Sequence, residues 1–174
     1  MEERLKKLIE DLMELSKASS GTMAVCIIPL DLTETLNQAL GEFSDKLDKA
    51  NLSMLYTPPA QQVMVSGDGR LTWRVLSNLL SNAIKYAMPG TRVYLDVRQE
   101  DAYAEVSLKN ISAEPLNVSA QELTERFVRG DASRNTEGSG LGLNIAKSLM
   151  ELQNGSLELT VDGDLFKATL KFPK

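Results

Sequence analysis

The sequence predicts an α+β fold: a two-layer α/β sandwich in which a mixed, mostly antiparallel sheet is covered on one face by three helices, with a further helix at the N-terminus. Long segments with apolar residues at helical spacing predict the helices, and shorter strand-like runs between them predict the sheet. Turn residues such as Asp162-Gly163 join several of these runs into hairpins. Helices interleaved with hairpin-connected strands indicate one layer of helices on one sheet.

The N-terminal segment Glu2–Lys17 is predicted to form an amphipathic helix. Its leucines recur at spacings of three and four residues, with charged residues between them: Leu5, Leu8, Leu12 and Leu15. Such an apolar stripe packs either on a partner helix or on the helix's own domain, and two heptads do not decide between these. Ser19-Ser20-Gly21 ends the helix and forms the predicted linker, so we expect residues 1–20 and 21–174 to be separate units.

The remaining elements follow in order along the chain. Helices are expected at Asp31–Lys49, Arg70–Ala87, Ala120–Phe127 and Leu141–Gln153. Strands are expected at Val25–Ile28, Leu52–Thr57, Val63–Ser66, Arg92–Gln99, Ala102–Lys109, Ser156–Val161 and Leu165–Phe172. Asp68 can cap the helix that follows it, and Asn154-Gly155 is typical of a left-handed helix end.

Composition limits the class of protein. With 174 residues, of which 43% are hydrophobic, the chain is long enough for one compact core. Its longest apolar run, Met23–Leu30, is far shorter than the roughly 20 residues that a membrane-spanning helix needs. The single cysteine, Cys26, permits no internal disulfide, and a net charge of −5 argues against binding to nucleic acid. These features favour a cytosolic location.

The predicted helix Arg70–Ala87 carries two asparagines one turn apart. At about 100° per residue, Asn78 and Asn82 lie about 40° apart, and Lys85 falls about 20° beyond Asn78. Asn82 is expected inside the margin of the apolar face, where an amide without a hydrogen-bond partner costs about 1–3 kcal/mol. Asparagine is also a poor helix former, so the pair suggests a bound ligand or metal. The alternative is two ordinary asparagines at the surface or satisfied locally.

Three glycines at alternate positions, Gly138, Gly140 and Gly142, lie at the start of the predicted helix Leu141–Gln153. Without a Cβ the backbone can approach an oxyanion closely, and the start of a helix offers free N–H groups and a positive dipole. The pattern predicts a phosphate-binding turn, although glycines also serve loops and close helix packing. The polar segment before the turn offers cations for phosphate charge: Arg126, Arg129 and Arg134.

Taken in order, these motifs resemble the ATP-binding catalytic domain of sensor histidine kinases. The resemblance is carried by VLSNLLSNAIKY (75–86), ERFVR (125–129) and GSGLGL (138–143), and it covers roughly residues 31–174. The same superfamily includes gyrase B subunits, mismatch-repair ATPases and a heat-shock chaperone, but the close asparagine spacing and the ERFVR segment favour the histidine kinases. The N-terminal helix also looks like the end of the second helix of a kinase dimerisation domain.

The resemblance implies a role for each motif residue. Asn82 would bind Mg²⁺ through its side-chain oxygen, because a neutral oxygen suits a small cation that keeps several waters. Asn78 would sit beside the phosphates of ATP, and Lys85 would offset their charge. Asn78, Lys85 and Arg129 are the expected catalytic residues.

Other motif residues would form the walls of the nucleotide pocket. Tyr86 would line it, and Phe127 and Arg129 would belong to a lid over it. The residues expected to wrap the phosphates are Gly138, Ser139, Gly140, Leu141, Gly142 and Leu143.

One motif of the family, Asp-x-Gly-x-Gly, is absent. The inward residues of the strand before its position alternate: Ala104, Val106 and Leu108. The next inward residue, Asn110, therefore stands where the family has an aspartate that accepts a hydrogen bond from the adenine amino group. An amide oxygen can still accept this bond, but without a full charge it is expected to be about half as strong. Ser112 and Glu114 replace the two glycines.

The implied activity is binding of ATP and Mg²⁺ and transfer of the γ-phosphoryl group to a histidine on a dimerisation helix. The chain contains no histidine, so the acceptor must lie outside it. We expect the chain to be the cytosolic, C-terminal part of a longer and membrane-bound bacterial sensor, which forms a homodimer and acts on a response regulator.

Other interpretations stay open at this point. The altered adenine motif would fit a degenerate, non-catalytic nucleotide-sensing module, and a protein-serine kinase of the anti-sigma-factor type needs no histidine of its own. A plain helix-pairing protein would explain the leucine stripe but would leave the asparagines and glycines unexplained.

Overall fold

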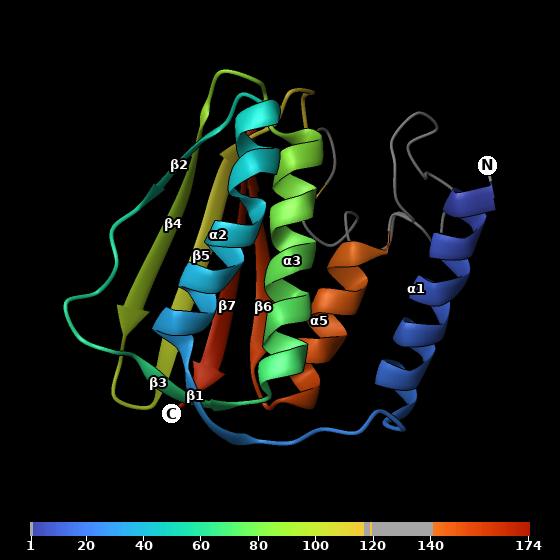
Figure 1. The fold of residues 1–174 in the computed structure, drawn as a ribbon, viewed down its shortest axis with the longest axis vertical. Helices are drawn as coiled ribbons and strands as arrows, with labels where there is room; N and C mark the ends of the chain where they lie inside the picture. Colours follow the sequence, from blue (N-terminus) through green and yellow to red (C-terminus); the bar gives the residue numbers. More distant parts are fainter. Residues whose placement is uncertain (1, 117–118, 120–140) are drawn as a thin grey trace.

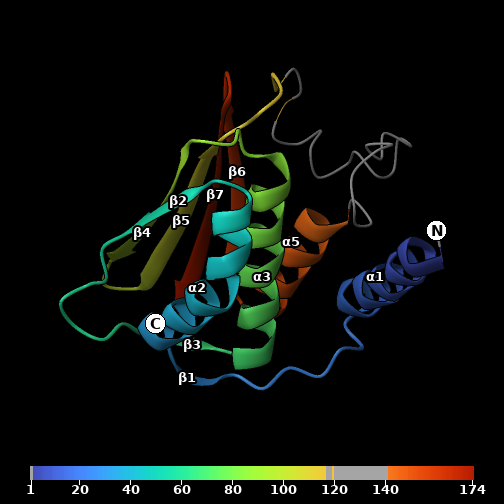
Figure 2. The same cartoon turned by 45° about the horizontal axis from the view of Figure 1, so that its top comes forward.

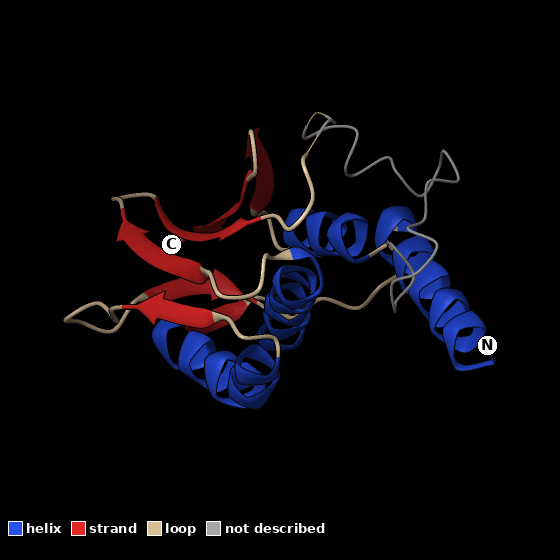
Figure 3. Cartoon of the chain, turned by 90° about the horizontal axis from the view of Figure 1, so that it is seen from above, coloured by secondary structure: helices blue, strands red, loops and turns tan. Residues whose placement is uncertain are grey.

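The computed structural model describes residues 2–116, 119 and 141–174. Their central feature is a five-stranded sheet, in the order β2 (Ser53–Tyr56), β4 (Arg92–Gln99), β5 (Tyr103–Ile111), β7 (Leu165–Pro173) and β6 (Ser156–Asp162). Three helices cover one face of this sheet (Figure 1): α2 (Leu32–Lys49), α3 (Gly69–Tyr86) and α5 (Gly142–Leu152). Figure 3 shows the two layers from above. The predicted α+β sandwich is confirmed.

The sheet is mixed, as predicted. β2 runs parallel to β4, whereas the pairs β4–β5, β5–β7 and β6–β7 are antiparallel. The turn between β6 and β7 contains Gly163 at a φ of 60°, which suits a tight hairpin. A second, two-stranded sheet joins β1 (Ile28–Asp31) to β3 (Met64–Gly67) at the end of the helix layer where α2 and α3 begin.

The core lies between the sheet and the helices. Alternate residues of β5 and β7 face the helices and are buried, which is the period-two pattern of a sheet with one covered face. The largest completely buried side chains come from both layers: Phe172, Leu32, Leu36, Leu141, Ile145, Leu149, Met150 and Leu170.

Aspartates fix the starts of α2 and α3, as the sequence predicts. The side chain of Asp31 accepts a hydrogen bond from the backbone N–H of Glu34 at 3.0 Å. Asp68 accepts from the backbone N–H groups of Arg70 and Leu71 with one oxygen, and from that of Cys26 with the other. The carboxylate of Asp68 therefore ties the start of α3 to the segment around Cys26.

The N-terminal helix α1 (Glu2–Ser20) lies outside the two layers and packs on α5 (Figure 2). The predicted amphipathic helix is confirmed, but only part of its leucine stripe is covered by the domain. Leu8 and Leu15 pack against the domain, whereas Leu5 and Leu12 are exposed together with Ile9 and Met13. The reason is geometric: at about 100° per residue the four leucines lie within about 80° of one another, and the face that meets the domain, through positions 8, 11, 15 and 18, covers only one edge of their stripe.

Several element bounds differ from the prediction. The strand expected at Val25–Ile28 is β1, which begins at Ile28 because its pairing with β3 joins Ile28 to Gly67. The predicted helix Ala120–Phe127 lies outside the described residues. The left-handed end after α5 is confirmed, with Asn154 at a φ of 65°. None of the helices among the described residues is long and apolar enough to cross a membrane.

Candidate functional site

The two asparagines of α3 lie where the helical spacing places them, at the margin of the helix layer. Asn78 is buried, with 9% of its surface exposed, and Asn82 and Lys85 are half-buried. Asn82 is thus neither in the core nor free in solvent, as predicted. This edge of α3 therefore offers a ligand the hydrogen bonds of two amides and the positive charge of Lys85.

The start of α5 meets this edge at Gly142. A Cβ added to Gly142 would lie 3.9 Å from both Cβ and Cγ of Asn78. The first of the two asparagines therefore touches the turn that opens α5, although the two residues are far apart in the sequence. Leu141 caps the helix without a side-chain hydrogen bond, and it is buried. The positive end of the α5 dipole thus lies beside the amide of Asn78.

The far end of α3 is joined to the end of β5. The backbone N–H of Met88 donates to Ile111, that of Ala113 donates to the carbonyl oxygen of Tyr86, and Ala87 forms a β-bridge with Ser112. Tyr86 is half-buried, and its ring centroid lies 5.2 Å from Nζ of Lys85. These bonds bring the last turn of α3 next to the strand end that carries Asn110.

Asn110 faces the helix layer, as predicted. It lies on β5 opposite Phe166 of β7, and only 3% of its surface is exposed. The turn after it differs from a glycine turn, because Ser112 is buried and its hydroxyl accepts a hydrogen bond from the backbone N–H of Glu114 at 3.3 Å. Asn78, Asn82, Lys85 and Tyr86 thus lie along one helix, and the last turn of that helix is bonded to the strand end that carries Asn110.

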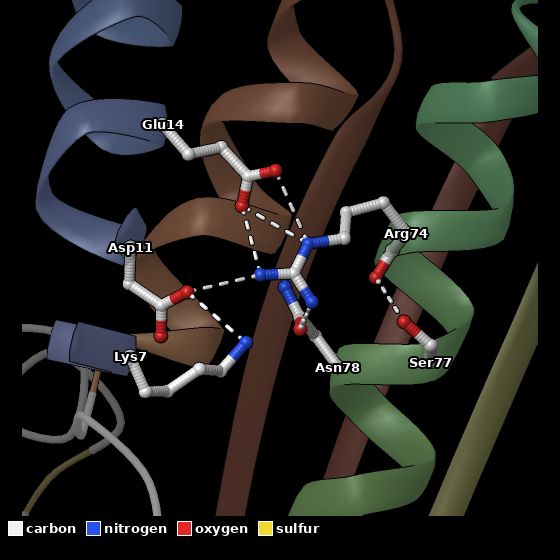
Figure 4. Close-up of polar contacts among 6 residues, drawn as sticks. All are labelled: Lys7, Asp11, Glu14, Arg74, Ser77 and Asn78. Carbon is white, nitrogen blue, oxygen red and sulfur yellow. Dashed lines mark hydrogen bonds and ion pairs between the residues drawn. The ribbon is translucent and has the colours of Figure 1, made fainter. Parts of the chain in front are cut away.

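A further residue, Arg74, enters this site, and the sequence analysis missed it. Its Nη1 donates to Oδ1 of Asn78 at 2.9 Å, and its other guanidinium nitrogens contact Asp11 and Glu14 of α1 (Figure 4). Burial lowers the pKa of Arg74, but the two carboxylates outweigh burial and raise it above its ordinary value. The only sequence signal was the spacing of four residues between Arg74 and Asn78.

The remaining predicted site residues lie outside the described part of the chain: Phe127, Arg129, Gly138, Ser139 and Gly140. Their roles stay predictions. Leu143, the last residue of the predicted phosphate-binding turn, is half-buried in the first turn of α5.

The described residues fit a nucleotide better than a metal held by protein alone. Nδ2 of Asn78 is buried and has no hydrogen-bond partner among the described residues, so it is a donor in need of an acceptor. Among those same residues, no group of three acidic, histidine or cysteine side chains could hold a metal ion. A cation that binds here would take a neutral oxygen such as that of Asn82 and its remaining ligands from water and phosphate.

Comparison with known proteins identifies the class. The family model described as "Histidine kinase-, DNA gyrase B-, and HSP90-like ATPase" matches residues 67–174, and the chain belongs to this family. This match spans α3, the β4–β5–β7–β6 part of the sheet and α5, which are the elements that form the site.

Individual relatives are sensor kinases. The chain is 31% identical over 155 residues to the signal transduction histidine-protein kinase BaeS of Escherichia coli, with 88% of this chain and 33% of BaeS covered. It superimposes on the Acinetobacter baumannii histidine kinase AdeS with a TM-score of 0.80 at 22% identity, covering 98% of this chain and 79% of AdeS.

A further solved structure with the same fold is full-length ShkA in complex with AMPPNP, with a TM-score of 0.79 at 20% identity, covering 97% of this chain and 35% of ShkA. The chain spans about a third of the length of curated relatives that it matches, such as BaeS.

Proposed function

We propose that this chain is the ATP-binding catalytic domain of a sensor histidine kinase, which binds ATP with Mg²⁺ and donates the γ-phosphoryl group to a histidine outside these residues. The observation that carries the proposal is Asn78, whose Nδ2 is buried without a partner among residues 2–116, 119 and 141–174 and whose side chain lies next to the glycine that opens α5. A donor in this position suits a phosphate oxygen. Because the chain belongs to an ATPase family, we assign this phosphate to ATP.

Each described residue then has a task. Asn78 donates a hydrogen bond to the phosphates, Lys85 offsets their negative charge, and Tyr86 lines the pocket at the end of α3. Asn82 offers its side-chain oxygen to the cation. Mg²⁺, which Asn82 would help to hold, would supply positive charge that neutralises the charge developing on the phosphates during transfer.

Asn110 is proposed to accept a hydrogen bond from the adenine amino group. It lies at the end of β5, and the bonds between that strand end and the last turn of α3 keep it near Tyr86. Leu141, Gly142 and Leu143 would bring the backbone of α5 to the phosphates.

The protein contributes mainly position and charge to such a transfer, because the chemistry of the phosphoryl group needs little covalent help. The chain has no histidine, so the phosphoryl acceptor must belong to another part of the protein or to another chain. We propose the dimerisation helices of a full-length sensor as its source. A homodimer, a response regulator as the next acceptor and a cytosolic site beside a membrane complete this proposal.

A calorimetric titration tests the proposed site. The chain is titrated with ATP and with GTP, each with and without Mg²⁺, and we expect Mg²⁺-dependent binding that favours ATP. Asn82→Ala should abolish the Mg²⁺ dependence while the circular dichroism spectrum stays that of the parent, because Asn82 is half-buried at the edge of α3. Unchanged affinity for ATP and Mg²⁺ in this variant would refute the role of Asn82, and no binding by the parent chain would refute the proposed function.

A further inference from the structure

Arg74 joins the N-terminal helix to the asparagine beside Gly142. On one side, its Nε donates to Oε1 of Glu14 at 3.0 Å, and its Nη2 lies 3.1 Å from Oδ1 of Asp11 and 2.9 Å from Oε1 of Glu14. On the other side, its Nη1 donates to Oδ1 of Asn78 at 2.9 Å. Figure 4 shows the guanidinium between the two carboxylates of α1 and the amide of Asn78. All three of its nitrogens are thus in use.

This contact fixes which way the amide of Asn78 points. A guanidinium has N–H donors and no acceptor, so the atom of Asn78 that faces it must be the oxygen. The amide nitrogen then points away from Arg74, where it stays buried and without a partner among the described residues. If the amide rotated by half a turn, its nitrogen would face the N–H groups of Arg74, so that two donors would oppose each other. The amide oxygen would then point away from the Arg74 guanidinium.

The carboxylates of α1 hold the guanidinium in turn. Asp11 is buried, with 4% of its surface exposed, and it also pairs with Lys7 at 3.3 Å. The Arg74 side chain is itself 29% exposed, so without α1 its charged end would be free to choose other rotamers in water. A planar guanidinium held by two carboxylates keeps one direction for its third nitrogen.

We propose that Arg74 is a positioning residue through which the docked helix α1 orients the Asn78 amide for nucleotide binding. The position of α1 is thereby coupled to the affinity of the site: with α1 docked, Nδ2 is presented as a donor, and with α1 displaced, the amide loses its fixed orientation. The proposal rests on the proposed nucleotide site, because the ligand of Nδ2 is taken to be a phosphate oxygen.

A double-mutant cycle tests the coupling. ATP affinity is measured by calorimetry for the parent, for Glu14→Gln, for Asn78→Ala and for the double variant. We expect Glu14→Gln to weaken ATP binding about three- to tenfold, because the contacts of Arg74 with residue 14 lose the negative charge that strengthens them. In the Asn78→Ala background the same change should have no effect, because there is no amide left to orient.

Two further measurements keep the result interpretable. Glu10→Gln is the matched control, since Glu10 is an exposed glutamate of the same helix, and it should leave ATP affinity unchanged. The side-chain amide of Asn78, followed by ¹⁵N NMR in the protein without nucleotide, should shift in Glu14→Gln and not in Glu10→Gln. A merely structural role of the ion pairs would not predict this shift.

The outcomes separate the two proposals. If the parent binds ATP but Glu14→Gln weakens binding equally with and without Asn78, or the amide resonance does not move, the role of Arg74 is overturned and the nucleotide site stands. If the parent binds no nucleotide, the proposed function fails, and the role of Arg74 fails with it.

Discussion

Asn110 is a residue where a single side chain is expected to set the strength of the proposed site without changing the fold. It is buried at the end of β5, where the family resemblance implies an aspartate. An amide oxygen accepts a hydrogen bond without the charge that would strengthen it, but it also avoids the cost of burying a carboxylate. A carboxylate at this position is therefore expected to raise the affinity for adenine and to lower the stability of the protein without nucleotide.

We predict that Asn110→Asp tightens ATP binding and lowers the free energy of unfolding of the protein without nucleotide. A charged acceptor makes a hydrogen bond about twice as strong, whereas burial opposes its ionisation. Calorimetry with ATP and urea unfolding without it measure the two effects. A weaker ATP complex in this variant would show that Asn110 does not face the base.

Asp68 is a second residue whose charge matters, here for stability. Burial raises the pKa of its carboxyl, but the N–H groups of Cys26, Leu71 and Arg70 outweigh burial and hold the pKa below the ordinary value of 3.8. A carboxyl whose pKa is lowered by folding stabilises the fold above its unfolded pKa. This stabilisation is lost as the pH falls from 3.8 through the lower folded value.

We therefore predict that Asp68→Asn lowers the free energy of unfolding at pH 7 by about 1–3 kcal/mol, because an amide cannot accept hydrogen bonds with both of its ends. The variant should also lose the part of the acid destabilisation that Asp68 contributes. Urea unfolding between pH 2.5 and 7 measures both. Parallel pH profiles for the variant and the parent would contradict the assignment.

At the scale of elements, the end of α5 is limited by close packing. A Cβ at Gly155 would clash with the backbone oxygen of Lys171 and would lie 2.8 Å from Cε of Met150. The helix can turn directly into β6 only because this position lacks a side chain. The backbone of β7 cannot move aside without disturbing its ladder with β5.

Gly155→Ala is predicted to lower the free energy of unfolding by about 1–3 kcal/mol through overpacking. Gly41→Ala is the matched control: Gly41 is an exposed residue within α2, and a Cβ there meets no atom within 4 Å. Because alanine favours a helix over glycine, this control should raise stability by up to about 1 kcal/mol. Thermal unfolding of both variants checks the prediction, which fails if they change stability in the same direction.

At the scale of the whole molecule, α1 is attached more weakly than the other helices. It meets the domain through Leu8, Leu15 and Ala18 and through the ion pairs of Arg74, while an apolar strip of α1 stays exposed. By contrast, α3 is buried between α2, α5 and the sheet. Few buried contacts imply that α1 can open on its own before the domain unfolds.

Hydrogen exchange measures this difference. We predict that amides of α1 exchange well before those of α3, and that added salt speeds exchange in α1 because it screens the half-exposed pairs of Arg74. Leu15→Ala should speed exchange in α1 further and leave that in α3 unchanged. Equal protection of α1 and α3 would show instead that α1 unfolds only together with the domain.

Much of the fold and part of the site could be predicted from the sequence because they depend on local patterns. The strand Arg92–Gln99 has the predicted bounds, since alternation and turn residues mark both of its ends. The caps Asp31 and Asp68 lie next to the helices that they start. The inward direction of Asn110 could be predicted because side chains alternate between the two faces of a strand.

Other features depend on which segments meet. The strand expected at Val25–Ile28 is displaced because its partner strand decides where pairing begins. The leucines of α1 form one stripe, and their spacing cannot tell which edge of that stripe meets the domain. The link of Arg74 to α1 could not be predicted, because its partner Glu14 lies 60 residues away in the sequence.

The order of helices and strands, their caps and the residue types suited to phosphate and cation follow from the sequence by itself, because each depends on neighbours within a few positions. Only the tertiary structure decided that Asn78 touches Gly142 and that α1 reaches Asn78 through Arg74. Those contacts join segments that are distant along the chain. Burial and charge pairing depend on how close residues are in space, not on how close they are in the sequence.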